Sequence, residues 1–130
     1  MFLLIGTNNL GHGTSTAAET LQGIVAVART LATQCPTATI HLIEIFPRGE
    51  KFNAMRGEVL QVNQALRAWV EGANRERRRS GGRDAYRIHA IGDAFVSSDG
   101  SIAKDMMPDS LHLTPDAYEI WAKAVVEAIR

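Results

Sequence analysis

The sequence predicts an α/β fold, a three-layer αβα sandwich in which helices cover both faces of a parallel sheet. Two observations support this prediction. Segments typical of strands alternate with segments typical of helices along the chain, and the first strand candidate is apolar throughout, as expected of a strand buried on both faces. Because there is no internal repeat and no second set of elements, residues 1–130 are expected to form a single domain.

The first strand and helix are marked by local signals. The strand is expected over residues 2–5, an apolar run that leads into a polar loop starting at Gly6. Thr16 and Glu19 have the spacing of a capping box at the start of the first helix. Apolar residues then recur at helical spacing until Pro36, which cannot continue a helix.

Two further strand and helix units follow in the same order. Residues 38–46 are rich in β-branched and apolar side chains and predict a second strand. Apolar residues spaced three and four apart from 59 to 73 predict a long second helix. Residues 86–91 predict a third strand, residues 92–112 a long polar loop, and Thr114, followed by proline, the start of the last helix.

Composition argues against several classes of function. Fourteen Lys and Arg residues balance fourteen Asp and Glu residues, so no net field attracts nucleic acid or an anionic membrane. The single cysteine, Cys35, cannot form an internal disulfide, and no apolar run reaches the length of a membrane span. Arginines at positions 75, 77, 78 and 79 lack interleaved aromatics and are interpreted as a solvated helix end. We expect a small-molecule ligand, no nucleic acid, no membrane span and no metal.

Asp109 and His112 are the candidate acid and base. A carboxylate that accepts the Nδ1 proton of a histidine fixes the tautomer of the ring and stabilises the imidazolium, which is what a general base needs. The pair lies just before the predicted start of the last helix, beyond the third strand. The alternative from these residues alone is that Asp109 caps a turn and His112 is a surface histidine.

Other polar residues follow the first two strands, where the ligand crevice of a parallel α/β sheet lies. The Asn8 side chain could donate a hydrogen bond to a developing oxyanion, or Asn8 and Asn9 could form an ordinary turn. Arg48 could bind a carboxylate or line the pocket, or be a solvated loop residue. His12 could touch the substrate from its loop, or be solvated.

Four blocks, in this order, resemble the later part of a known hydrolase family: LLIGTNN, FPRGEKFN, QVNQAL and SSDGSIAKDMMPDSLHLTPDAY. The family is that of the SGNH, or GDSL-type, hydrolases, and within it the likeness is to catalytic subunits of the intracellular platelet-activating-factor acetylhydrolases. The resemblance extends from Phe2 into the last helix. It implies a flavodoxin-like parallel sheet and the hydrolysis of carboxylic esters, often with short acyl groups, without metal or organic cofactor.

The resemblance also implies roles for particular residues. Asn8 corresponds to the family's oxyanion-hole asparagine, and Gly6 and Thr7 belong to the same block and are expected beside the substrate. Asp109 and His112 correspond to the acid and base of a Ser-His-Asp triad. Arg48 and His12 remain the further substrate-binding candidates.

The family's nucleophilic serine belongs to a Gly-Asp-Ser block that residues 1–130 do not contain. The chain begins at what resembles the third of five strands, so the fold is expected to lack the first two. IGDA, at residues 91–94, has Ala94 where the serine would lie and is rejected as the nucleophile site. Four serines near the candidate acid and base are not expected to replace it: Ser97, Ser98, Ser101 and Ser110.

Two main hypotheses about function follow, and a third, that Asp109 and His112 activate water directly, has less support because the family that the chain resembles relies on covalent catalysis. In the first, the chain is the carboxyl-terminal portion of an ester hydrolase and acts on a small-molecule ester. In the second, it is a catalytically inactive domain that assembles or binds through an exposed sheet edge, because loss of the first strand would bare the edge of residues 2–5. A second copy of the chain or a missing amino-terminal segment is expected to cover that edge, or else the three strands form a compact remnant of low stability.

Overall fold

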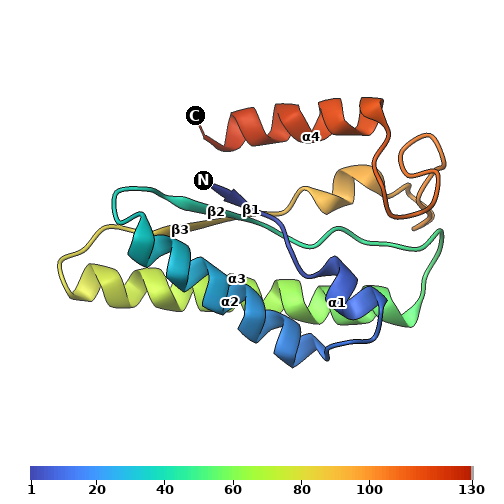
Figure 1. Ribbon diagram of the computed structural model, residues 1–130. Helices are drawn as coiled ribbons and strands as arrows, with labels where there is room; N and C mark the ends of the chain where they lie inside the picture. The colour runs from blue at the N-terminus through green and yellow to red at the C-terminus, as the bar shows by residue number, and fades with distance from the viewer. Residues whose placement is uncertain (130) are drawn as a thin grey trace.

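The computed structural model describes residues 1–129 and contains a sheet of three parallel strands in the order β1-β2-β3. Its strands are β1 (Phe2–Leu3), β2 (Ile40–Ile43) and β3 (Tyr86–His89). The α-helices are α1 (Thr7–Gly11), α2 (Ala17–Gln34), α3 (Ala54–Arg79) and α4 (Pro115–Ala128), and η1 (Gly92–Phe95) is a 3-10 helix. Helices α2 and α3 cover one face of the sheet and α4 lies over the other, so the predicted three layers are confirmed (Figure 1).

The predicted helix starts are confirmed because their capping signals are local. Thr16 and Glu19 form the complete capping box before α2, and Thr114 accepts a hydrogen bond from the backbone N–H of Ala117 at the start of α4. Helix α3 begins earlier than its apolar stripe, at Ala54, because the side chain of Asn53 caps it.

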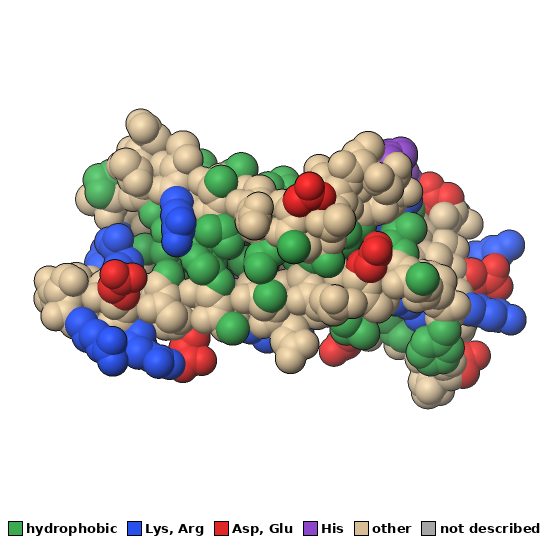
Figure 2. Space-filling view, turned by 90° about the horizontal axis from the view of Figure 1, so that it is seen from below, with side chains coloured by type: hydrophobic (Ala, Val, Ile, Leu, Met, Phe, Trp, Pro, Cys, Tyr) green, Lys and Arg blue, Asp and Glu red, His purple; other side chains and the backbone are tan. Residues whose placement is uncertain are grey.

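Each face of the sheet has its own apolar core. Ile40 and Leu42 of β2 face α2 and α3, whereas Ile43 packs with residues of α4 and of the loop after β3. Met107 in that loop is fully buried. On the outer side of α2 and α3, hydrophobic side chains follow the seam between the two helices (Figure 2).

The strands are shorter than the apolar runs that predicted them. A strand was predicted over residues 38–46, and only Ile40–Ile43 form one. A strand was also predicted over residues 2–5, and only Phe2–Leu3 form one. Beyond Ile43 the chain is held by a side chain, because buried Asn63 of α3 accepts from the N–H of Ile45 at 2.9 Å and donates to its carbonyl at 2.9 Å. These bonds replace ladder bonds to a neighbouring strand, so Ile45 stays buried outside the sheet.

The outer edge of β1 is open in the part of the chain that the structure describes. Met1, Phe2 and Ile5 are 47%, 39% and 38% exposed, although all three are large apolar residues. An unpaired edge with apolar side chains is a template for another strand. Among residues 1–129, no helix combines the length and apolar character needed to cross a membrane.

A histidine pair occupies the α4-facing side of the sheet. His41 Nδ1 and His89 Nε2 are 3.0 Å apart, and the ring of Phe2 lies 4.8 Å from that of His41. Burial lowers the pKa of His41 below 6.5, as do the charges of His89, the amino terminus and Arg87. Burial and then Arg87 lower the pKa of His89 in the same direction.

We therefore expect acid to destabilise the fold before any carboxylate is titrated. In the unfolded chain both histidines bind protons at about pH 6.5, whereas in the folded chain their pKa values are lower. The free energy of unfolding is therefore highest above about pH 6.5 and decreases as the pH falls from there toward the pKa values of the folded state. Thermal unfolding should show a lower Tm at pH 5 than at pH 7.5. Replacing both His41 and His89 by leucine should remove this difference, and a variant that keeps it would contradict the assignment.

Candidate active site at the carboxyl end of the sheet

One cavity at the carboxyl end of β1 and β2 brings the two main candidate segments together. It has a volume of about 250 Å³. Asn8, from just after β1, and His112, from just before α4, both line it although 104 positions separate them in the sequence. The full lining consists of Leu4, Thr7, Asn8, Phe46, Pro47, Leu111, His112, Leu113, Tyr118 and Trp121.

Asp109 both caps the turn before α4 and contacts the ring of His112. Its Oδ1 accepts hydrogen bonds from the backbone N–H groups of Leu111 at 3.0 Å and His112 at 2.7 Å. Its Oδ2 lies 2.5 Å from His112 Nδ1. The two readings of the sequence are thus compatible, because one carboxylate oxygen builds the turn and the other meets the imidazole.

This arrangement keeps Asp109 ionised and sets the tautomer of His112. The backbone N–H of His112, followed by its ring, lowers the pKa of Asp109 to about 2. An ionised carboxylate accepts the Nδ1 proton, so the neutral ring carries its lone pair on Nε2. Nε2 has no protein hydrogen-bond partner within residues 1–129 and is available to a substrate or nucleophile.

Ser110 lies between the two residues in a strained conformation. It is the one residue other than glycine among 1–129 with a positive φ, 60°, a value that side chains with a Cβ rarely adopt. The backbone N–H of Gly49 donates to the carbonyl of Ser110 at 2.9 Å and helps to hold this turn. Ser110 lines a different cavity, together with Arg48 and Asp109, and is not among the residues that line the Asn8 and His112 cavity.

The segment that carries Asn8 is helical, where a polar loop was expected. Helix α1 starts directly after Gly6, whose φ of 112° is accessible to glycine. A Cβ on Gly6 would also lie 2.9 Å from Ile45 Cδ1 and 3.0 Å from Thr20 Cγ2, so Gly6 allows the chain to turn closely over the core. The expectation of a loop was wrong because this turn depends on tertiary contacts. Asn8 is consequently held in the first turn of α1, exposed at the cavity.

The remaining substrate-binding candidates divide into those at the cavity and those away from it. Thr7 lines the cavity beside Asn8, whereas Gly6 is the N-cap of α1, packs against the core and does not line the cavity. Arg48 donates from Nη1 to the carbonyl of Thr7 at 3.1 Å and packs against Gly11, so it braces α1 instead of lining this cavity. His12, at the end of α1, is exposed and is not a lining residue among those described.

The aromatic wall of the cavity was not identified from the sequence. The ring of Trp121 lies 5.5 Å from that of Phe46 and 5.6 Å from that of Tyr118. Trp121 and Tyr118 have the periodicity of an ordinary core-facing helix stripe, so the pattern gave no signal that they border a site. The Nε1 of Trp121 and the Oγ1 of Thr7 are buried without a hydrogen-bond partner in residues 1–129. No cluster of three metal-ligating side chains occurs in the described part of the chain.

Comparisons with known proteins identify the family of the chain. The model of the GDSL-like Lipase/Acylhydrolase family matches residues 1–120. The chain is 35% identical over 125 residues to platelet-activating factor acetylhydrolase IB subunit alpha2 of Gallus gallus, covering 96% of the chain and 49% of that relative. It is 34% identical over 114 residues to subunit alpha1 of Homo sapiens, covering 88% and 44% respectively.

A solved structure shows the same fold over the whole chain. It is a Streptococcus pneumonia protein with the provisional description of a platelet activating factor, superposes with a TM-score of 0.67 at 22% identity, and is matched over 99% of this chain and 58% of its own. The chain spans about half the length of the curated relatives that it matches. The family match over residues 1–120 shows that the chain belongs to the GDSL-like lipase/acylhydrolase family.

Proposed function

We propose that the chain carries the acid, the base and an oxyanion donor of a carboxylic ester hydrolase, namely Asp109, His112 and Asn8. The observation that carries this proposal is that Asn8 and His112 line one cavity while Asp109 holds the ring of His112. A carbonyl group in this cavity would meet a hydrogen-bond donor and a general base together.

The chemistry follows from the roles that these side chains can fill. His112 Nε2 takes the proton of a hydroxyl nucleophile as its oxygen attacks the ester carbonyl, and Asp109 stabilises the imidazolium that forms. The Asn8 side-chain N–H donates to the oxyanion of the tetrahedral intermediate. The imidazolium then returns the proton to the departing alcohol, and water, activated by the same nitrogen, releases the acid from the acyl-enzyme.

The nucleophile is proposed to come from outside the residues described at this cavity. Its lining within residues 1–129 includes no serine and no cysteine. Ser110 lines another cavity. The hydroxyl of Ser101 donates to Asp99 Oδ1 at 2.7 Å. A further polypeptide segment that reaches the cavity would supply the attacking hydroxyl, which agrees with relatives about twice as long as this chain.

A short acyl ester is the proposed substrate. The cavity of about 250 Å³ is small and its walls include Phe46, Leu113 and Trp121, which suit a compact apolar group better than a long chain. The relatives are named acetylhydrolases, which agrees with an acetyl group as the acyl part.

Hydrolysis of p-nitrophenyl acetate by the isolated chain tests the proposal. This activated ester can react without a serine, because the free nitrogen of His112 can attack it directly or activate water. We expect saturable release of p-nitrophenol by the folded chain, above the rate of the same chain unfolded in urea. Equal rates for folded and unfolded chain would contradict the proposed site.

The open edge of β1 supports a second candidate function, assembly through that edge without catalysis. Exposed apolar Met1, Phe2 and Ile5 would be covered by strand pairing with a partner, such as a second copy. The relatives are named as subunits, which agrees with association. This candidate predicts no ester hydrolysis above background and a mass that rises with concentration in light scattering, whereas an active, strictly monomeric chain would exclude it.

A further inference from the structure

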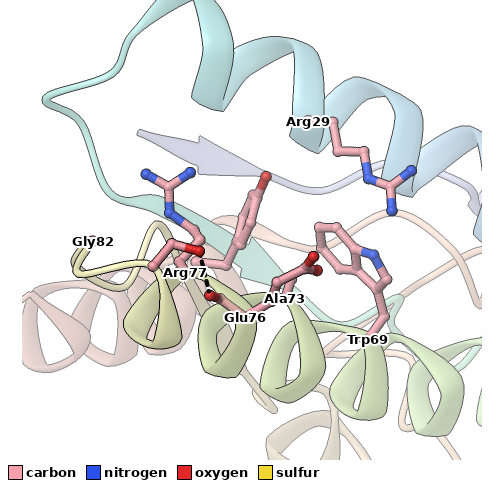
Figure 3. Close-up of a pocket in the computed structure, with 8 residues that line it drawn as sticks. Arg29, Trp69, Ala73, Glu76, Arg77 and Gly82 are labelled. Carbon is pink, nitrogen blue, oxygen red and sulfur yellow. Dashed lines mark hydrogen bonds between the residues drawn. The ribbon is translucent and has the colours of Figure 1, made fainter.

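A second cavity lies at the opposite end of the sheet from the candidate active site. Its volume is about 430 Å³, and it lies where α2 and α3 meet the amino-terminal end of β3 (Figure 3). Figure 3 shows Arg29 reaching over from α2 while Trp69, Ala73, Glu76 and Arg77 line successive turns of α3. Its lining consists of Arg29, Trp69, Ala73, Glu76, Arg77, Ser80, Gly82 and Tyr86.

The aromatic part of this cavity is fixed in place. Buried Asn74 donates to the carbonyl of Tyr86 at 2.8 Å and accepts from the N–H groups of Ala85 at 3.1 Å and Tyr86 at 3.2 Å. These bonds lock the start of β3 to α3. The ring of Tyr86 packs 4.7 Å from that of Trp69. A ligand would therefore meet an aromatic surface that is already ordered.

Some of the arginines on α3 that lie outside the cavity are used in ion pairs, whereas others, Arg56 and Arg79, form none within residues 1–129. The ion pairs are those of Arg67 with Glu44, Arg75 with Glu71 and Arg78 with Asp84. Arg77 and Arg29 form no ion pair within residues 1–129. Arg75, Arg78 and Arg79 are exposed, as the interpretation of a solvated helix end requires, whereas Arg77 departs from it because its side chain is half-buried at the cavity.

Arg77 is held in position by the turn that follows α3. Arg77 Nε donates to the carbonyl of Arg83 at 3.1 Å, and the N–H of Gly82 donates to the carbonyl of Arg77 at 2.8 Å. This leaves the terminal guanidinium N–H groups for another acceptor. Arg29 is exposed, with its guanidinium carbon 5.9 Å from the centre of the Trp69 ring.

The charged side chains that line the cavity favour a singly charged anion. Two guanidinium groups face it, and Glu76 supplies one carboxylate that forms no ion pair within residues 1–129. The surplus is one positive charge, so a monoanion neutralises the cavity while Glu76 disfavours a dianion. Trp69 and Arg77 are eight residues apart on α3, a separation of about 12 Å along the helix axis.

We propose that this cavity binds an elongated organic monoanion with an aromatic end. Its carboxylate would pair with Arg77, and its ring would lie against Trp69 and Ala73 under Arg29. Paired guanidinium N–H groups match the geometry of a carboxylate, and the aromatic surface supplies apolar contact. The site is independent of the ester hydrolase proposal, because none of its residues lines the Asn8 and His112 cavity.

Tryptophan fluorescence provides a direct test. The chain has two tryptophans, so a Trp121→Phe variant leaves Trp69 as the reporter at this cavity. The probe is 4-phenylbutyrate, and its neutral amide, 4-phenylbutyramide, is the matched compound without charge. We expect saturable quenching by the carboxylate in the millimolar range or below, and a response to the amide that is at least about tenfold weaker, the loss of one charge-assisted hydrogen-bond pair.

Three substitutions in the Trp121→Phe background assign the binding to the cavity. Arg77→Gln should weaken binding about tenfold, and Glu76→Gln, which removes the opposing charge, should tighten it about threefold. Arg75→Gln, on the same helix but outside the cavity, should leave the affinity unchanged. Circular dichroism should confirm that each variant is folded. Equal quenching by carboxylate and amide, no saturation, or equal losses for Arg77→Gln and Arg75→Gln would overturn the proposal.

Discussion

Substitution of His112 by alanine is expected to bring ester hydrolysis down to the rate of the unfolded chain. The ring of His112 lines the cavity and is the only base there whose free nitrogen is oriented by a carboxylate within residues 1–129. A positioned general base contributes about 10²–10⁴-fold to a rate. The side chain is 78% exposed, so its removal should leave the fold and the Tm almost unchanged.

The matched control for this variant is His12→Ala. His12 is also exposed, but it lies at the end of α1 and does not line the cavity. A free imidazole catalyses hydrolysis of an activated ester to a small extent wherever it lies on the surface, and this control measures that background. The two variants should differ by the full effect of His112, and equal rates would remove His112 from the mechanism.

Substitution of Asp109 by asparagine is expected to reduce ester hydrolysis nearly as much as His112→Ala does, while leaving the turn before α4 intact. The asparagine oxygen can still accept from the N–H groups of Leu111 and His112, as Oδ1 does now. In place of Oδ2 it presents an N–H donor to His112 Nδ1, which forces the ring proton onto Nε2. A ring that carries its proton there cannot act as the base, and the equivalent change in a Ser-His-Asp site costs about 10⁴-fold in kcat.

The pH dependence of this variant separates a tautomer effect from a structural one. The pKa of Asp109 is lowered to about 2, so its carboxylate is ionised throughout the range in which an esterase is assayed. Activity lost in Asp109→Asn should therefore not be recovered at any pH from 5 to 8, and far-UV circular dichroism should be unchanged. Wild-type activity in the asparagine variant would show that the carboxylate does not set the tautomer.

The features of the fold that could be predicted from sequence are those fixed by neighbours along the chain. The capping box of Thr16 and Glu19 and the Thr114 cap are satisfied within three residues, so their patterns located α2 and α4. Strand lengths could not be predicted in the same way. An apolar run shows that a segment is buried, whereas the ladder ends where a partner ends, and buried Asn63 takes over the bonding of Ile45.

The candidate site shows the same division. Asp109 and His112 are three residues apart, and a local turn brings them together, so the spacing was informative. That Asn8 lies at the same cavity follows from the rule that carboxyl ends of parallel strands share one edge. The bracing role of Arg48 could not be predicted, because it depends on a contact with the carbonyl of Thr7, 41 positions earlier in the chain.

A comparison of the hydrolysis rates of Asn8→Ala and Asn9→Ala tests most directly whether Asn8 and His112 act on the same ester molecule. Asn8 lines the cavity with His112, whereas the Asn9 side chain turns to Ser15 Oγ at 3.5 Å. Loss of an oxyanion donor costs about 10²–10³-fold in kcat, so with p-nitrophenyl acetate Asn8→Ala should show a loss of that order and Asn9→Ala the wild-type rate. Equal rates for the two variants would contradict a shared site.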